Sequence, residues 1–400
     1  MLSIFLCNYF HFNYIVNNLV YTLAYLCYNV ITRNTHFEQI AQEAFMREIG
    51  GYFPYIEEPD NKNHYLDGLC PPEGDLRFLM SGRCANYLAL EDFKKQQPHP
   101  VAYVPLYTCE TVIDPFVKAG YELIFYDFTK DMIPVFDESV LDKIHLISIC
   151  GYYGFSGYDR EFLKKCEERG ICIIEDTTHS IFSADGIYEG CTYVVGSMRK
   201  WLGVSCGGFA IKKTGSFTPL ILPPHEVHLN MRRQGLAVKT DAFRHPDTVA
   251  ASVSEDASRL LWDAELLLRK VYDIHGSDSE SVDIIEYYDF DALKRQRREN
   301  YRYMLEHCPK SDAYTIVFPY LDDATVPSHF TLYAADRGKF KEYLSQNGIH
   351  ATSYWPVGPY INLEGHTDCA YIYDHVISIP CDQRYTAEDM AYICRVLKDF

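Results

Sequence analysis

Short apolar runs alternate with amphipathic segments from Arg77 onward. The runs predict buried strands, and the segments between them predict helices, two of which end at Gly120 and Gly170. We expect strands at 101–105, 121–126, 145–150, 171–175, 191–196 and 209–212, and helices at 85–95, 110–119 and 158–169. Strands that are apolar throughout and alternate with helices indicate an α/β fold, with a mostly parallel sheet covered on both faces.

The pattern changes after the last of these strands. Residues 219–291 are more polar and irregular. A long amphipathic helix is predicted at 290–307, followed by a strand at 328–335, a helix at 337–347 and a last helix from Ala387. We therefore expect an N-terminal arm at 35–76, a large domain at 77–250 and a smaller α+β domain at 251–400.

The first 32 residues contain no Lys, Arg, Asp or Glu. A membrane span needs about 20 apolar residues, but four asparagines between residues 8 and 18 interrupt this run. A signal peptide begins with positive charge, which is absent here. A third interpretation is an over-long reading frame, for which Met46 offers a later start. We favour the third and expect residues 1–34 to form an extension outside the core.

Composition narrows the function classes. The 400 residues are enough for two domains, and the net charge of -18 provides no basic surface for nucleic acid or an anionic membrane. The 14 cysteines form neither a C-x-x-C pair nor a cluster at zinc spacing. We interpret them as small core residues of a cytoplasmic protein and expect no metal site.

Three segments carry candidate chemistry. Asp176 directly follows the strand at 171–175, and ligands of parallel sheets bind beyond the carboxyl ends of the strands. Lys200 lies between the strand at 191–196 and the pair Gly207-Gly208. The turn Ser81-Gly82-Arg83 opens a helix, whose free N–H groups favour an anion. Taken singly, these are also ordinary features: a turn Asp, a surface Lys and a turn Gly.

Taken together, the three segments suit pyridoxal 5'-phosphate (PLP). Its phosphate needs a helix N-terminus, its pyridine nitrogen needs a carboxylate that keeps it protonated, and its aldehyde needs a lysine amine for a Schiff base. Phosphate turn, acid and lysine follow one another along this chain in that order.

Further motifs in the sequence resemble those of one known family. From about Arg77 to its C-terminus the chain resembles the DegT/DnrJ/StrS sugar aminotransferases, which have the three-layer fold of aspartate aminotransferase. The matching segments are Ser81-Gly82 with Ala85, Val104-Pro105 with Tyr107-Thr108, residues 116–120, Tyr153-Gly154, residues 174–180, Lys200 with Gly207-Gly208, Gly348-Ile349 with Tyr354-Trp355-Pro356, and Ile379-Pro380.

The resemblance implies a role for each site residue. Lys200 would hold PLP, Asp176 would face the pyridine nitrogen, and His179 would lie beside the ring hydroxyl. It also implies a homodimer that moves an amino group from glutamate to a nucleotide-linked keto-sugar. Two alternatives remain open: elimination or cleavage by PLP on the same fold, and a non-catalytic regulatory protein.

The chain departs from the family pattern at three places. Arg83 follows the phosphate-turn Gly82, where the family has Ser or Thr; it would pair with the phosphate or point elsewhere. Cys109 occupies the position of an aromatic that stacks on the cofactor, so Tyr107 would substitute or the contact would be lost. The family's upstream serine is missing, and Ser197 is the candidate to replace it.

Other conspicuous residues have simpler explanations. We expect Arg232-Arg233 and the run at 295–298 to be solvated helix faces. His329 is similar to a family histidine near the active site, but we interpret it as structural. The tyrosines at 287–288 and 301–303 have the spacing of core residues.

Overall fold

The structure is a computed structural model that describes residues 48–55, 62–245 and 251–400. The predicted extension at 1–34 and the first part of the predicted arm lie outside the described residues. In the described part, no helix has the length and apolar character needed to cross a membrane.

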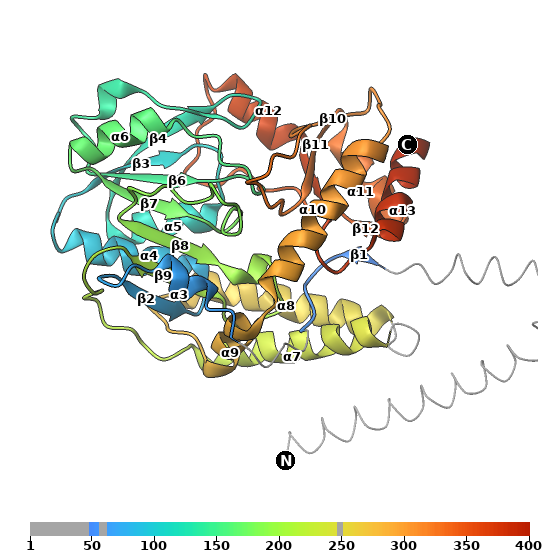
Figure 1. The fold of residues 1–400 in the computed structure, drawn as a ribbon, viewed down its shortest axis with the longest axis horizontal. Helices are drawn as coiled ribbons and strands as arrows, with labels where there is room; N and C mark the ends of the chain where they lie inside the picture. The colour runs from blue at the N-terminus through green and yellow to red at the C-terminus, as the bar shows by residue number, and fades with distance from the viewer. Residues whose placement is uncertain (1–47, 56–61, 246–250) are drawn as a thin grey trace, which may run out of the picture. The chain divides into compact units, whose positions relative to one another are not determined.

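An eight-stranded sheet, in the order β2-β9-β8-β7-β6-β3-β4-β5, forms the centre of the larger part (Figure 1). All neighbouring strands from β8 to β4 pair in parallel, while β2, β9 and β5 pair antiparallel at the two edges. The predicted mostly parallel sheet is confirmed. The strands are β2 (Asp75–Leu79), β3 (Val101–Pro105), β4 (Glu122–Phe128), β5 (Pro134–Val135), β6 (Leu146–Cys150), β7 (Cys172–Asp176), β8 (Tyr193–Ser197) and β9 (Gly208–Lys212).

Apolar residues on both faces of this sheet explain why helices cover it on both sides. Leu146 and Ile174 belong to one core together with α4 (Gly82–Lys94) and α5 (Glu110–Ala119). Ile147 and Ile173, the residues adjacent to them in sequence, belong to a second core with α6 (Arg160–Glu168). Successive strand residues point to opposite faces, so each strand contributes to both cores.

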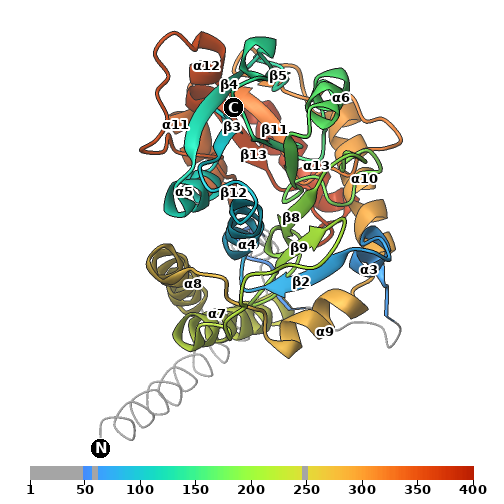
Figure 2. The same ribbon diagram turned by 90° about the vertical axis from the view of Figure 1, so that its left-hand side faces the viewer.

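The segment expected to be irregular contains long helices, so that expectation is wrong. Helices α7 (Glu226–Arg244) and α8 (Ala251–Val271) lie side by side beneath α4 (Figures 1 and 2), and α9 (Ser279–Tyr287) follows. The buried face of α7 includes polar residues such as His228 and Arg232, which hide its helical period. The domain boundary expected at residue 250 stays a prediction. Leu268 of α8 lies beyond that boundary in sequence but packs into the core that contains α4.

A smaller part is built around the antiparallel sheet β10-β11-β13. Its helices include α10, and its sheet shares one apolar core with the α6 face of the large sheet. The predicted helix at 290–307 is confirmed. The remaining elements are β1 (Ile49–Gly50), α3 (Tyr65–Leu69), the 3-10 helices Glu138–Val140 and Met198–Lys200, α10 (Phe290–His307), β10 (Tyr314–Ile316), β11 (Phe330–Ala334), α11 (Arg337–Gln346), β12 (Ile349–His350), α12 (Thr367–His375), β13 (Val376–Ile379) and α13 (Ala387–Asp399).

The turn after β6 joins the two parts at Gly154. This residue has φ of +105°, and an added Cβ would lie 2.3 Å from the carbonyl oxygen of Val326. Gly154→Ala should therefore lower the free energy of unfolding by about 3 kcal/mol or more, because backbone strain and overlap add. Gly170→Ala is the matched control: Gly170 has φ of +69° but open space around it, so the loss should be only about 1 kcal/mol.

Urea unfolding followed by circular dichroism measures both variants. Equal losses in the two proteins would contradict the close approach of the turn to the 326–329 segment.

Candidate active site

A cavity of about 690 Å³ opens at the carboxyl edge of the parallel strands. The residues that follow β2, β3, β6, β7 and β8 all reach it, as expected for a parallel sheet. The smaller part supplies the opposite wall. The residues that matter below are Ser81, Gly82, Arg83, Cys109, Asp176, His179, Ser197, Arg199, Lys200, Arg232, Glu265, His329, Tyr354, Trp355, Asp382 and Arg384.

The first turn of α4 is held against the end of β8. The side chain of Ser81 caps the helix by accepting a hydrogen bond of 3.2 Å from the backbone N–H of Cys84. A Cβ on Gly82 would lie 3.1 Å from the Cβ of Ser197, and one on Gly208 would lie 2.1 Å from the carbonyl oxygen of Ser81. These glycines allow the close contact. The first N–H groups of α4 have no acceptor within the helix, which suits an anion at this end of the cavity.

Asp176 is the last residue of β7 and lines the cavity. One carboxylate oxygen accepts a hydrogen bond of 2.9 Å from the backbone N–H of Thr178, which fixes its orientation. Burial raises the pKa of Asp176, although Thr178 and the charge of Lys200 act in the opposite direction. A carboxylate in this setting gains from a cationic partner such as a protonated ring nitrogen.

Lys200 ends the short helix after β8, and its side chain is open to the cavity. Its Nζ lies 6.0 Å from the ring centroid of Tyr354. Burial lowers the pKa of the amine, and the neighbouring charge of Arg199 lowers it further. Both effects favour the neutral amine, the form that reacts with carbonyl groups.

His179 and His329 lie together in the wall, their ring centroids 6.3 Å apart. The ring of His179 stacks on Trp355 at 5.5 Å. Burial lowers the pKa of both histidines, that of His329 to about 3, so both are neutral. His329, interpreted from the sequence as structural, also lines the cavity, and its role stays a prediction.

Cys109 and Tyr107 are placed differently from each other. Cys109 lines the cavity just before α5. Tyr107 is fully buried behind the wall, where its hydroxyl hydrogen-bonds with the Tyr153 hydroxyl at 3.0 Å and donates to the carbonyl of Tyr354. The suggestion that Tyr107 replaces the missing stacking aromatic is therefore wrong.

No family model matches the sequence, and no curated protein matches it. Solved structures do match. PseC of Helicobacter pylori, an aminotransferase involved in the biosynthesis of pseudoaminic acid, is 14% identical, with a TM-score of 0.58 over 88% of this chain and 99% of its own. The PMP-form of the putative sugar aminotransferase Spr1654 of Streptococcus pneumoniae has 14% identity and a TM-score of 0.57 over 88% and 91%.

A DegT DnrJ EryC1 StrS aminotransferase of Brucella abortus is also 14% identical, with a TM-score of 0.51 over 91% of this chain and 93% of its own. The chain has the fold of the sugar aminotransferases. The predicted fold, that of PLP-dependent transferases, is thereby confirmed.

Two arginines of this sugar-aminotransferase fold were expected in solvent and are buried instead. Arg232 lines the cavity, and Arg297 packs its guanidinium carbon 4.5 Å from the ring centroid of Trp201. The spacing could have indicated this: Arg297 lies four residues after Leu293 and four before Tyr301, on the apolar face of α10. Arg232 likewise lies three residues after Leu229 and four before Leu236.

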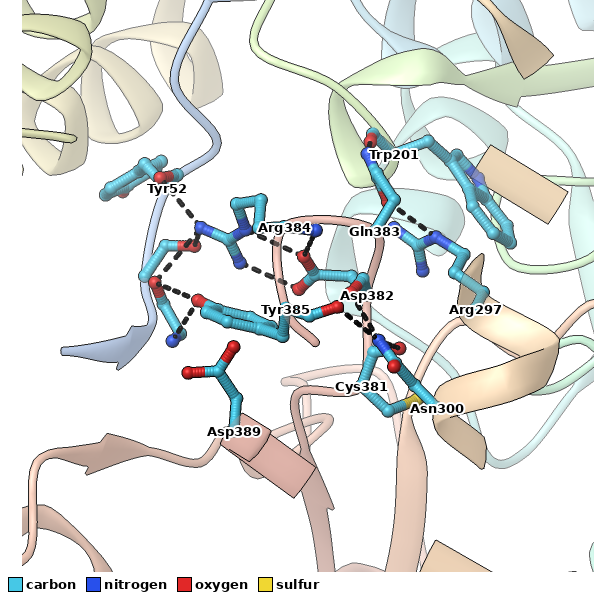
Figure 3. Close-up of polar contacts among 12 residues, drawn as sticks. Tyr52, Trp201, Arg297, Asn300, Cys381, Asp382, Gln383, Arg384, Tyr385 and Asp389 are labelled. Carbon is cyan, nitrogen blue, oxygen red and sulfur yellow. Dashed lines mark hydrogen bonds and ion pairs between the residues drawn. The ribbon is translucent and has the colours of Figure 1, made fainter. Parts of the chain in front are cut away.

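The loop after β13 contacts both the N-terminal end of the described chain and the segment that follows Lys200 (Figure 3). Asp382 and Arg384 form a buried bidentate ion pair with two contacts of 2.8 Å. The Nη1 of Arg384 donates to the backbone carbonyls of Gly50, at 3.1 Å, and Tyr52, at 3.2 Å. The pair therefore fixes the N-terminal strap, residues 50–53, which forms part of the cavity wall.

The same loop also holds the residue after Lys200. The amide nitrogen of Gln383 donates to the carbonyl of Trp201 at 2.6 Å, and its oxygen accepts from Nε of Arg297 at 2.8 Å. The indole N–H of Trp201 donates to the carbonyl of Thr178, next to His179, at 2.9 Å. Lys200 is thus placed by contacts with both parts of the molecule.

The ion pair gives a stability prediction. Asp382→Asn leaves the buried Arg384 without its carboxylate and should cost about 3–5 kcal/mol in urea unfolding at neutral pH. Burial raises the pKa of Asp382, but Arg384 outweighs it and the net pKa is lowered. The ion-pair contribution should therefore be complete above about pH 4 and fall as Asp382 becomes protonated, narrowing the difference between the two proteins in acid.

The control is Asp389→Asn in the exposed cap of α13, which should cost only about 1 kcal/mol. Similar losses in the two variants would show that the Asp382–Arg384 pair does not hold the strap.

Proposed function

We propose that this protein is a PLP-dependent aminotransferase. The observation that carries the proposal is that Lys200, Asp176 and the first turn of α4 line one cavity, on a fold shared with sugar aminotransferases. A regulatory protein that performs no chemistry does not need a lysine of lowered pKa in the same cavity as a carboxylate.

The residues present fit the cofactor. The first turn of α4, next to Ser197, would take the phosphate, because its N–H groups and helix dipole favour an anion. Asp176 would accept a hydrogen bond from the protonated ring nitrogen, and neutral His179 would lie near the ring hydroxyl. Lys200 would provide the amine that holds the cofactor covalently. PLP, when bound, supplies an electron sink that stabilises negative charge on the carbon next to the amino group.

The protein's own residues would then act on protons. The lowered pKa of Lys200 makes its Nζ a base that can take a proton from the α-carbon of the amino donor and return it elsewhere. Asp176 would keep the ring nitrogen protonated through its charge. The cavity walls from the smaller part, including Tyr354 and Trp355, would exclude water from the reacting atoms.

For the substrates we propose glutamate as amino donor and a nucleotide-linked keto-sugar as acceptor. Proteins of similar fold include PseC, an aminotransferase involved in the biosynthesis of pseudoaminic acid, and the putative sugar aminotransferase Spr1654. We also propose a homodimer with its active sites at the subunit interface, acting in the cytoplasm. All cysteines of the described residues are free thiols, in keeping with a reducing compartment.

Substitutions of Lys200 and of Asp176 should have different effects on cofactor absorption and on turnover. Lys200→Ala removes the amine, so the visible absorption of bound PLP should be lost and turnover should cease. Asp176→Asn keeps the amine, so the absorption should persist, while the rate should fall on the order of a hundredfold or more because the ring nitrogen loses its charged partner. Absorbance spectra with stopped-flow kinetics measure both. Full activity in either variant would contradict the assigned roles.

Amino donors test the reaction type. The absorbance of the PLP-loaded protein should fall when glutamate is added and should recover with a keto-sugar nucleotide. Release of ammonia or a cleaved side chain without recovery would instead indicate elimination or cleavage. A protein that does not respond to any donor would contradict the proposed transferase activity.

Light scattering tests the assembly. We expect the mass of a dimer for the PLP-loaded protein. A monomer that binds PLP fully would contradict the proposed interface site.

A further inference from the structure

Three guanidinium groups gather at the α4 end of the cavity. Arg83 lies in the first turn of α4, Arg199 directly precedes Lys200, and Arg232 comes from α7. All three line the cavity. Their side chains are only 4%, 10% and 4% exposed, in that order. Buried charges of like sign at such close quarters need a compensating partner.

The carboxylates nearby balance this charge only in part. Arg199 and Arg232 share one oxygen of Glu265, which lies 3.0 Å from the Nη1 of Arg232 and also contacts Arg199. The acid partner of Arg83 is Asp114, whose carboxylate oxygen lies 3.9 Å from the Nη1 of Arg83. Three cations therefore face two carboxylates, in a chain whose overall charge is -18.

Hydrogen-bond donors of this cluster are left without acceptors. Among the residues that the structure describes, the Nε and Nη1 of Arg83 and the Nε of Arg199 are buried and make no hydrogen bond. Arg232 differs, because it donates to the carbonyls of Val204 and Ser205 as well as to Glu265. Arg232 thus supplies fixed charge, while Arg83 and Arg199 keep unused donors. Unsatisfied donors of this kind are costly unless a ligand accepts from them.

Electrostatics agrees with this geometry. Burial lowers the pKa of each of the three arginines, and the charge of Arg199 lowers that of Arg232 further. An anion placed among them would remove this repulsion. The first turn of α4 adds its own N–H groups at the same end of the cavity.

We propose that Arg83, Arg199 and Arg232 form a binding site for a phosphate ester at the α4 end of the cavity. Planar guanidinium forks match phosphate oxygens, and the charge of a dianion would offset the excess of the cluster. The inference rests on the proposed function only for the source of that phosphate. The cofactor supplies one such group, and the diphosphate of a nucleotide-linked acceptor supplies another.

Arg199→Gln is the principal variant, because it leaves the ion pair between Arg232 and Glu265 intact. Arg232→Gln is the second, and Arg199→Lys tests whether charge alone suffices. The matched control is Arg233→Gln: Arg233 follows Arg232 on α7, lies outside the cavity and pairs with Asp278. Thermal unfolding of each full-length protein confirms that it folds before binding is measured.

Fluorescence titrations of the cofactor-free full-length protein compare PLP with pyridoxal, which lacks the phosphate. If the cofactor's phosphate occupies the site, Arg199→Gln should weaken PLP binding by about tenfold to a hundredfold and leave pyridoxal binding unchanged. If the acceptor's diphosphate occupies it, PLP binding should hold, while binding of uridine diphosphate to the PLP-loaded protein should weaken by the same factor. Arg233→Gln should change neither affinity.

Unchanged affinity for PLP and for uridine diphosphate in both Arg199→Gln and Arg232→Gln would overturn the proposal. Inorganic pyrophosphate separates this site from the enzyme activity. One outcome would support the anion site but contradict the proposed function. In that case the wild-type protein binds pyrophosphate and Arg199→Gln loses this binding, but the wild-type protein does not turn over any amino donor.

Discussion

The parallel pairing of β7 with β8 is the constraint on which the rest of the site depends. In this register Asp176 lies opposite Val195, and the chain of β8 then continues past Ser197 to Lys200. An acid and a lysine that are far apart in sequence therefore leave the sheet at the same edge. The antiparallel pairing of β9 with β2 and β8 completes the arrangement, because Gly208 brings the start of α4 against the same edge.

Burial then determines how these groups behave. The same loss of water that raises the pKa of Asp176 lowers that of Lys200, so the acid gains from a cationic partner and the amine becomes a base. The arginine cluster adds positive charge at one end of the cavity. The protein as a whole is acidic, but cationic side chains are concentrated around this one cavity, where they attract anionic ligands.

Local patterns in the sequence predicted the sheet and much of the site. The strand at 101–105 and the helices at 110–119 and 290–307 have the predicted bounds, because their apolar periods, and Gly120 at the end of the first helix, are local signals. Asp176, His179, Ser197 and Lys200 were predicted for the same reason, since each lies at or shortly after the end of a strand; all four line the cavity, and their roles stay predictions.

The misses have a common physical origin in contacts between distant segments. Arg384 contacts Gly50, which is 334 residues earlier in the sequence, and no local sequence pattern predicts such a contact. Arg232 and Arg297 resemble solvated charges until their helices are packed, because their burial depends on Glu265 and Trp201 from other elements. Tyr107 was misplaced because a strand end shows which residues are near a site, but not which side chains face it.

The central claim is that Lys200 is the amine that holds the cofactor. Borohydride reduction of the PLP-loaded protein fixes the cofactor to its lysine, and mass spectrometry of the peptides then locates the label. We expect a single labelled peptide with the modification on Lys200. A label on Lys212, Lys213 or any other lysine would contradict it, and the proposed mechanism with it.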